Sequence, residues 1–235
     1  MRRFLLPVIA GAFLNPCVIF AEAMPPPALE AYAAAKVRYA NPVNRFEYAD
    51  IARQLEEVLR LAPDAQGARL LRIAALVKAG EKRAAGEEMK RVAAVRDKLD
   101  DVEQLRLRVL AANLAGKPQE EIRFLNALAE RQPEDRWLRY ELARAHADVE
   151  QYAQAVEYVD QALALAGSEA RWEGSWIHHL HSKALLRSGG DPREAIAAAL
   201  AGRGEATTWR STLYRLALAQ YAAGDAVAGR NSLEE

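Results

Sequence analysis

A repeated pair of short amphipathic helices constrains the fold of this chain more than any other feature of its sequence. The clearest pair runs from Asp135 to Ala166, where a polar break at Glu150 and Gln151 separates two segments with helical periodicity. Apolar residues of the first segment recur at steps of four, three and four: Leu138, Leu142, Ala145 and Val149. Those of the second are Tyr152, Ala155, Val156, Val159, Ala162, Leu163 and Ala166. Neither helix alone can bury its apolar stripe, so the pair needs neighbours of the same kind.

The same pattern recurs along most of the chain. Positions equivalent to Ala155 are spaced by 34, 36, 34, 40 and 34 residues, and they are Ile51, Ala85, Glu121, Ala155, Ala195 and Gly229. Glycines mark the turn inside most repeats, at Gly80, Gly116, Gly190 and Gly224. Prolines fall where two repeats end, at Pro63 and Pro133. A period of about 34 residues indicates an array of stacked helix pairs.

The small residues Ala143, Ala155 and Ala162 resemble those of the tetratricopeptide repeat, whose two helices cross closely at small side chains. The resemblance covers nearly the whole chain after its first segment. It implies an all-α fold, a right-handed α-solenoid of stacked antiparallel helix pairs. The sequence departs from the family pattern at Glu121 and Ile51, which replace the small residue at the crossing point.

The first 23 residues have the order of segments that is typical of a secretory signal. A positive start at Met1–Arg3 precedes an apolar run from Phe4 to Phe20 and a small-x-small site at Ala21–Ala23. We therefore expect residues 1–23 to be a signal peptide that is cleaved before Met24. Residues 24–235 would then form about five to six helix pairs, the last incomplete. The run is short and broken for a membrane-spanning helix, so we expect no stable membrane insertion after cleavage, and an uncleaved anchor is the alternative.

Cysteine and charge content restrict the compartment and the partners. The only cysteine, Cys17, lies in the predicted signal, so residues 24–235 contain no cysteine to form a disulfide. Arginine outnumbers lysine by 25 to 7, which with the many alanines suggests a bacterial origin and favours the periplasm. After residue 23 there are 30 basic and 31 acidic side chains, and such a balance gives no long-range field to attract nucleic acid.

No motif in the sequence points to an enzyme or to a cofactor. Acidic pairs such as Glu120–Glu121 diverge on a helix instead of converging on one substrate, and no nucleophile motif is present. The most suggestive cluster is His178, His179 and His181, in which His178 and His181 share a helix face. Two imidazoles are too few for a zinc or copper site. Metal binding by these histidines is therefore only an alternative to packing or solvated side chains.

The resemblance implies a function in binding. In tetratricopeptide arrays the first helix of each repeat lines the concave face, which predicts a groove built from Arg106, Asn113, Trp137, Tyr140, Arg144, Arg187, Tyr214 and Tyr221. Arginine and aromatic residues are effective interface residues, although the aromatics could instead pad contacts between repeats. We expect a non-enzymatic periplasmic scaffold or adaptor that binds a protein or peptide through this groove. A helical subunit of an envelope export or assembly machine is the alternative, and the short final helix could also pair with a second copy.

Overall fold

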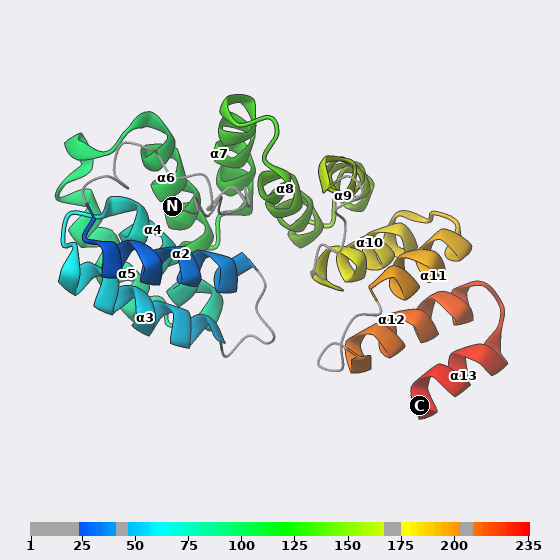
Figure 1. Cartoon of the computed structure of the whole chain (residues 1–235). Helices are drawn as coiled ribbons and strands as arrows, with labels where there is room; N and C mark the ends of the chain where they lie inside the picture. The colour runs from blue at the N-terminus through cyan, green and yellow to red at the C-terminus, as the bar shows by residue number, and fades with distance from the viewer. Residues whose placement is uncertain (1–23, 41–46, 167–174, 203–208) are drawn as a thin grey trace, which may run out of the picture. The chain divides into compact units, whose positions relative to one another are not determined.

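The computed structural model describes residues 24–40, 47–166, 175–202 and 209–235, and helices are the only regular elements in those ranges (Figure 1). This confirms the expected all-α fold of adjacent helix pairs. The predicted signal peptide and Cys17 lie outside the described residues. None of the described helices is both long and apolar enough to cross a membrane.

The chain divides into two compact units, the first ending at Glu103. Its helices are α2 (Pro26–Ala40), α3 (Glu47–Leu61), α4 (Gln66–Ala79), α5 (Lys82–Ala93) and the short 3₁₀ helix η1 (Arg96–Lys98). α2 packs on α3, α3 on α4 and α4 on α5. The core of this unit contains fully buried aliphatic side chains, among them Ile51, Leu55, Leu71 and Ile73.

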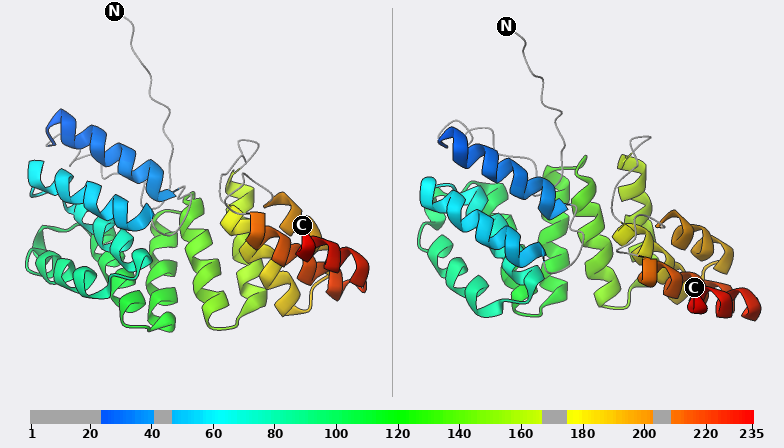
Figure 2. Two further views of the ribbon diagram at one scale, coloured as in Figure 1. Left: turned by 90° about the horizontal axis from the view of Figure 1, so that it is seen from below. Right: turned by 60° about the horizontal axis from the view of Figure 1, so that its bottom comes forward.

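The second unit begins at Gln104, inside helix α6 (Asp101–Leu114). It continues with α7 (Pro118–Arg131), α8 (Arg136–Asp148), α9 (Tyr152–Ala166), α10 (Ser175–Ser188), α11 (Pro192–Ala201), α12 (Trp209–Ala222) and α13 (Ala226–Glu234). From α7 to α13 each helix contacts its successor, and Figure 2 shows α8 and α9 side by side. The even-numbered helices α6 to α12 are the first helices of four successive pairs.

The same turn joins the two helices of five pairs. At each turn one residue has a positive φ, namely Gly80, Gly116, Glu150, Gly189 and Gly224, with φ between 61° and 85°. The N–H of the next residue donates to the carbonyl five residues earlier, as Glu81 does to Leu76 and Gln151 to His146. This is the Schellman arrangement, which satisfies the last carbonyls of the first helix. Its recurrence gives structural support to the repeat that the sequence predicts.

One of these turns is longer than the others. The turn between α10 and α11 has its left-handed residue at Gly189, and not at the predicted Gly190. In the α8–α9 turn the N–H of Ala155 donates to Gln151, the residue directly after Glu150. The N–H of Ala195 donates to Asp191, two residues after Gly189, so this turn contains one additional residue. A position in α10 therefore lies one residue further from Ala195 than the equivalent position in α8 lies from Ala155.

The predicted crossing positions of the second helices are buried. Ile51, Ala85, Ala155 and Ala195 have no exposed surface, and Glu121 is 4% exposed. Gly229 is also buried, and a Cβ atom at this position would lie 2.9 Å from the Tyr221 ring. Close contact between the helices of a pair thus explains the preference for small residues, and Glu121 needs a separate explanation.

Candidate functional site

All eight predicted groove residues lie in the second unit, on the first helices of its pairs. Arg106 and Asn113 come from α6, Trp137, Tyr140 and Arg144 from α8, Arg187 from α10, and Tyr214 and Tyr221 from α12. The structure divides them into two groups. Members on α6 and α8 are partly buried and make contacts within the chain, whereas those on α10 and α12 are exposed.

Arg144 is the centre of a network of charged side chains. Its Nε donates to Glu141 at 2.8 Å, its Nη1 donates to Asp148 at 2.7 Å, and its Nη2 donates to Glu121. The amide of Asn113 donates to both carboxylate oxygens of Glu121, at 2.9 and 3.0 Å. We call these five residues the Arg144 network. It explains how a carboxylate is tolerated at a crossing position that is alanine in other repeats, because the buried Glu121 has two partners.

The electrostatics of the Arg144 network favour its charged state. Burial by itself would lower the pKa of Arg144, but the carboxylates of Glu141, Glu121 and Asp148 outweigh burial and hold this pKa above its ordinary value. Three carboxylates surround one guanidinium, so the network carries a surplus of negative charge. Every nitrogen of Arg144 already has a partner within the chain. Arg144 is thus held by contacts within the chain, and the exposed carboxylate of the network is Asp148.

The two aromatic residues of α8 contribute to the contact between repeats. Trp137 and Tyr140 meet edge to face, with ring centroids 5.8 Å apart and an interplanar angle of 84°. Both pack on a buried cluster formed by residues of α8, α9 and α10, namely Ala143, Val159, Ala162 and Ile177. Arg106 likewise donates to Gln132 at 3.2 Å. The padding role that the sequence left open for these aromatics thus has direct structural support.

The predicted residues on α10 and α12 keep more of their surface. Tyr214 is 52% exposed and Tyr221 43% exposed, although Tyr221 also covers Gly229. The guanidinium of Arg187 lies 5.3 Å from the centroid of the Tyr152 ring, and the ammonium of Lys183 lies 5.8 Å from the same centroid. Sequence reasoning missed Lys183 and Tyr152. The spacing of four between Lys183 and Arg187 was a visible signal, but their contact with α9 was not.

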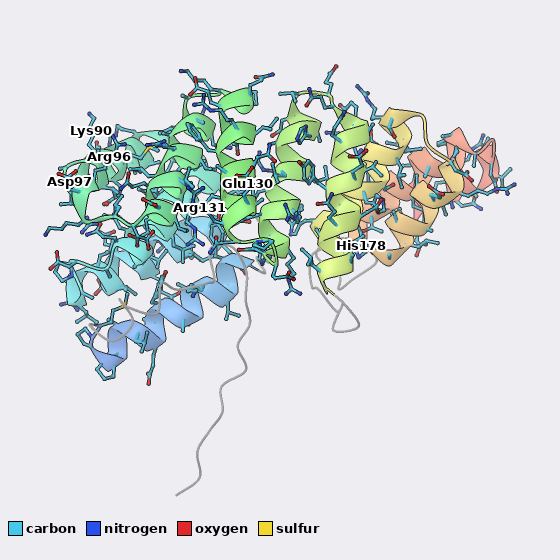
Figure 3. The ribbon with its side chains drawn as sticks, turned by 90° about the horizontal axis from the view of Figure 1, so that it is seen from above. Lys90, Arg96, Asp97, Glu130, Arg131 and His178 are labelled. Atoms are coloured by element: carbon cyan, nitrogen blue, oxygen red, sulfur yellow. The ribbon has the colours of Figure 1, made fainter. Side chains whose placement is uncertain are left out.

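The three histidines of α10 do not converge on one point. The Nε2 of His179 lies 2.7 Å from the hydroxyl oxygen of Thr212, and this hydroxyl donates to the carbonyl of Gly202 at 3.3 Å. His181 faces Asp160 of α9 at 3.3 Å, and Figure 3 marks His178 on α10. Among the described residues, no group of three or more His, Cys, Asp or Glu side chains could hold a metal ion.

Burial sets the protonation of these histidines. Burial first, and then the positive charges of Arg215 and His178, lower the pKa of His179 to about 4. Burial also lowers the pKa of His178, with a smaller contribution from His181. His179 is therefore neutral at pH 7. Because the single proton of Thr212 is donated to Gly202, the Nε2 of His179 donates the hydrogen bond to Thr212.

Comparison with known proteins identifies the fold. No protein-family model matches the chain, and no curated protein matches it. A solved kinesin light chain-like protein of Podosopora anserina with nearly identical TPR-like repeats superposes with a TM-score of 0.56 at 21% identity, covering 71% of this chain and 90% of that one. BtubC from P. vanneervenii superposes with a TM-score of 0.55 at 14% identity, covering 91% and 88%. At these identities the likeness concerns the fold.

Proposed function

We propose that this chain, which has the fold of tetratricopeptide-like repeat proteins, is a non-enzymatic scaffold of the periplasm that binds another protein or peptide. Folds of this kind generally mediate protein interactions. The observation that carries the proposal for this chain is the exposed pair Tyr214 and Tyr221 on α12. They are seven residues apart, so they lie on one side of the helix.

Exposed tyrosines of this kind are suited to protein binding. A tyrosine ring offers a large contact area with few rotatable bonds, and its hydroxyl can form a hydrogen bond at the edge of an interface. On α8, the aromatic residues Trp137 and Tyr140 are occupied by packing. The binding surface that we propose therefore lies on α10 and α12, and no longer on the whole predicted groove.

Mutation of Tyr214 tests this proposal, because this side chain is the more exposed of the two. The mature chain, residues 24–235, would be used to recover partners from envelope extract, and binding of the recovered protein would then be titrated. Tyr214→Ala should weaken binding by about tenfold or more if the ring is a central contact. Leu61→Ala is the matched control, since Leu61 is 41% exposed but lies on α3 in the first unit. Equal affinities of Tyr214→Ala and the unaltered chain would count against the proposal.

Location in the periplasm is supported by the order of segments in residues 1–23. Intact-mass measurement of protein purified from cells tests it directly. A mass that corresponds to a chain starting at Met24 is expected. A mass that retains residues 1–23 would instead favour an anchored or internal protein. Light scattering of the same sample would test the prediction of pairing through the C-terminal end.

A further inference from the structure

Helices α8 and α10 can be aligned through their turns and their buried residues. Both helices end at a left-handed residue, Glu150 after α8 and Gly189 after α10. Twelve, seven and five residues before this turn, α8 has the buried Leu138, Ala143 and Ala145, and α10 has the buried Ile177, Ser182 and Ala184. The two helices therefore correspond with an offset of 39 residues. This correspondence allows their charged positions to be compared.

Both helices place a cation at the same position. Arg144 lies six residues before Glu150, and Lys183 lies six residues before Gly189. The surroundings of the two cations differ completely. The three carboxylates that hold Arg144 are Glu121, Glu141 and Asp148, and the residues at their equivalent positions around Lys183 are Ala155, Leu180 and Arg187.

The cations of α10 consequently have no carboxylate partner in the described part of the chain. Lys183 and Arg187 both lie over the Tyr152 ring, at 5.8 and 5.3 Å, and neither forms an ion pair there. They are four residues apart on one helix, a spacing at which like charges repel. Arg187 is exposed and Lys183 partly exposed, so a partner can reach both.

Charge on the neighbouring first helix has the same sign. Helices α10 and α12 contact each other, and the charged side chains that the structure describes on them are Lys183, Arg187 and Arg215, with no aspartate or glutamate. Arg215 lies 5.7 Å from the Tyr214 ring. The net charge of the whole chain is zero, so this cationic character is local.

We propose that Lys183 and Arg187 bind a carboxylate in an acidic segment of the partner protein. This inference rests on the proposed function and adds the chemistry of the partner. The partner's carboxylate would give Lys183 an acidic partner, as Asp148 does for Arg144 from within the chain. Arg187 can bind a carboxylate through two parallel N–H groups, and the Tyr152 ring already holds both cations in place.

The decisive variant is Arg187→Asp, which recreates in α10 the spacing of Arg144 and Asp148. Lys183 would then have an acidic partner within its own helix, so the carboxylate of the partner protein would lose its site. Arg193→Asp is the control, because Arg193 is an exposed arginine on α11 outside this site. Circular dichroism would verify that both variants remain helical.

The probes are labelled peptides of one length in which apolar residues alternate with Asp and Glu, with Asn and Gln, or with Lys and Arg. Fluorescence anisotropy with the mature chain should show the acidic peptide bound at least about tenfold tighter than the Asn and Gln peptide. The Arg187→Asp variant should lose this preference, and Arg193→Asp should keep it. High salt should weaken binding of the acidic peptide because the site is solvent-accessible.

Several outcomes would overturn the inference. One is equal binding of the acidic and the Asn and Gln peptides, and another is unchanged binding to Arg187→Asp. Equal binding of a single-stranded oligonucleotide of the same charge would show unspecific attraction of anions. A partner recovered from extract that depends on Tyr214 but binds Arg187→Asp normally would leave the proposed function standing and remove only the acidic segment. If no recovered protein depends on Tyr214, the proposed function itself fails.

Discussion

Each of the two units contains a cluster of charged side chains around one central charge, and the two central charges are opposite in sign. In the first unit Glu88, 4% exposed, accepts hydrogen bonds from Arg72 and from Arg91, and Arg69 lies 3.5 Å away. In the second unit Arg144 is bound by three carboxylates. A buried carboxylate among arginines in the first unit thus has its counterpart in a partly buried arginine among carboxylates in the second.

The surplus positive charge around Glu88 in the first unit is better accommodated than the surplus negative charge around Arg144 in the second. Arg91 is 63% exposed, Arg72 also donates to the carbonyl of Ala52, and Arg69 donates to that of Pro63. In the second unit the side chain of Glu121 is 5% exposed and its partners are Arg144 and Asn113. Arginine carries five N–H donors and finds backbone acceptors easily, whereas a buried carboxylate needs donors brought to it. We therefore expect the second unit to be more sensitive to loss of its central charge.

The largest effect should come from Arg144→Leu. This change leaves Glu121 and Glu141 without their ion pair to Arg144, and breaking a buried pair from one side costs about 3 to 5 kcal/mol. Urea unfolding of the mature chain measures this loss, and hydrogen exchange shows whether it falls in the second unit. Adding Glu121→Ala, the residue found at positions 85 and 155, should restore part of the stability. A loss below about 1 kcal/mol in the single variant would contradict the importance of the network.

The second-largest effect should come from acid, which should destabilise the second unit. All four histidines, His146, His178, His179 and His181, belong to this unit. The pKa of His179 is lowered to about 4 in the folded state from an ordinary value of 6.5. Between pH 6.5 and pH 4 His179 is protonated in the unfolded chain but neutral in the folded chain. The free energy of unfolding therefore has its full value above pH 6.5 and decreases as the pH falls toward 4. The loss contributed by His179 is up to about 3 kcal/mol.

The matched variant for the acid prediction is His179→Gln, whose amide can donate to Thr212 but does not titrate. Unfolding at pH 7.5 and pH 5 should differ less in this variant than in the unaltered chain, and hydrogen exchange at pH 5 should rise first in α10 and α12. The first unit contains no histidine and should be insensitive over this range. Equal acid sensitivity of the two units would contradict the assignment to His179.

A smaller effect is expected from Glu88→Gln in the first unit. The amide keeps the shape of the carboxylate but removes its charge from between Arg69, Arg72 and Arg91. Arg69 and Arg72 keep their backbone acceptors, and Arg91 is exposed to water, so we expect a loss of about 2 kcal/mol, less than for Arg144→Leu. Urea unfolding under the same conditions gives the comparison. If Glu88→Gln proves the more damaging change, the contrast between the units is reversed.

The smallest effect concerns the turns. The first unit has Gly80 at the left-handed position of its turn, and the second unit has Glu150 at the equivalent one. Glu150→Gly should stabilise the chain, because glycine adopts a positive φ without strain. The larger unfolded-state entropy of glycine offsets part of this gain, so we expect about 0.5 kcal/mol. A Cβ at Gly80 would meet no atom within 4 Å, so Gly80→Ala should cost about 1 kcal/mol through conformation alone. Thermal melts of both variants measure the difference.

Much of the fold could be predicted because it depends on local pattern. The crossing positions Ala85, Ala155 and Ala195 are buried as the period requires, and Gly80 and Gly224 adopt the left-handed turn. The turn after α10 was misplaced by one residue because two adjacent glycines, Gly189 and Gly190, both satisfy the sequence pattern.

The candidate site was less predictable because it depends on contacts between helices. The sequence identified Glu121 as a departure from the repeat, but its partner Arg144 lies 23 residues later on another helix. Glu141 and Asp148 stand three and four residues from Arg144 on the same helix, so their ion pairs could have been predicted from the spacing. The third carboxylate, Glu121, is brought to Arg144 only by helix packing. Lys183 and Tyr152 were missed for the same reason, since their proximity arises from the packing of α10 on α9.

The buried Glu121 also has a consequence for the order in which the helix pairs assemble. Crossing points made of alanine, as at Ala85, Ala155 and Ala195, are chemically interchangeable, so a folding chain could stack such pairs out of sequence. Glu121 restricts α7, because a neighbouring helix without a cation at the position of Arg144 would leave the buried carboxylate with only the neutral amide of Asn113 as its partner. Among the first helices α4, α6, α8, α10 and α12, only α8 has an arginine at this position, and α10 has Lys183 there, so Glu121 favours the pairing of α7 with α8.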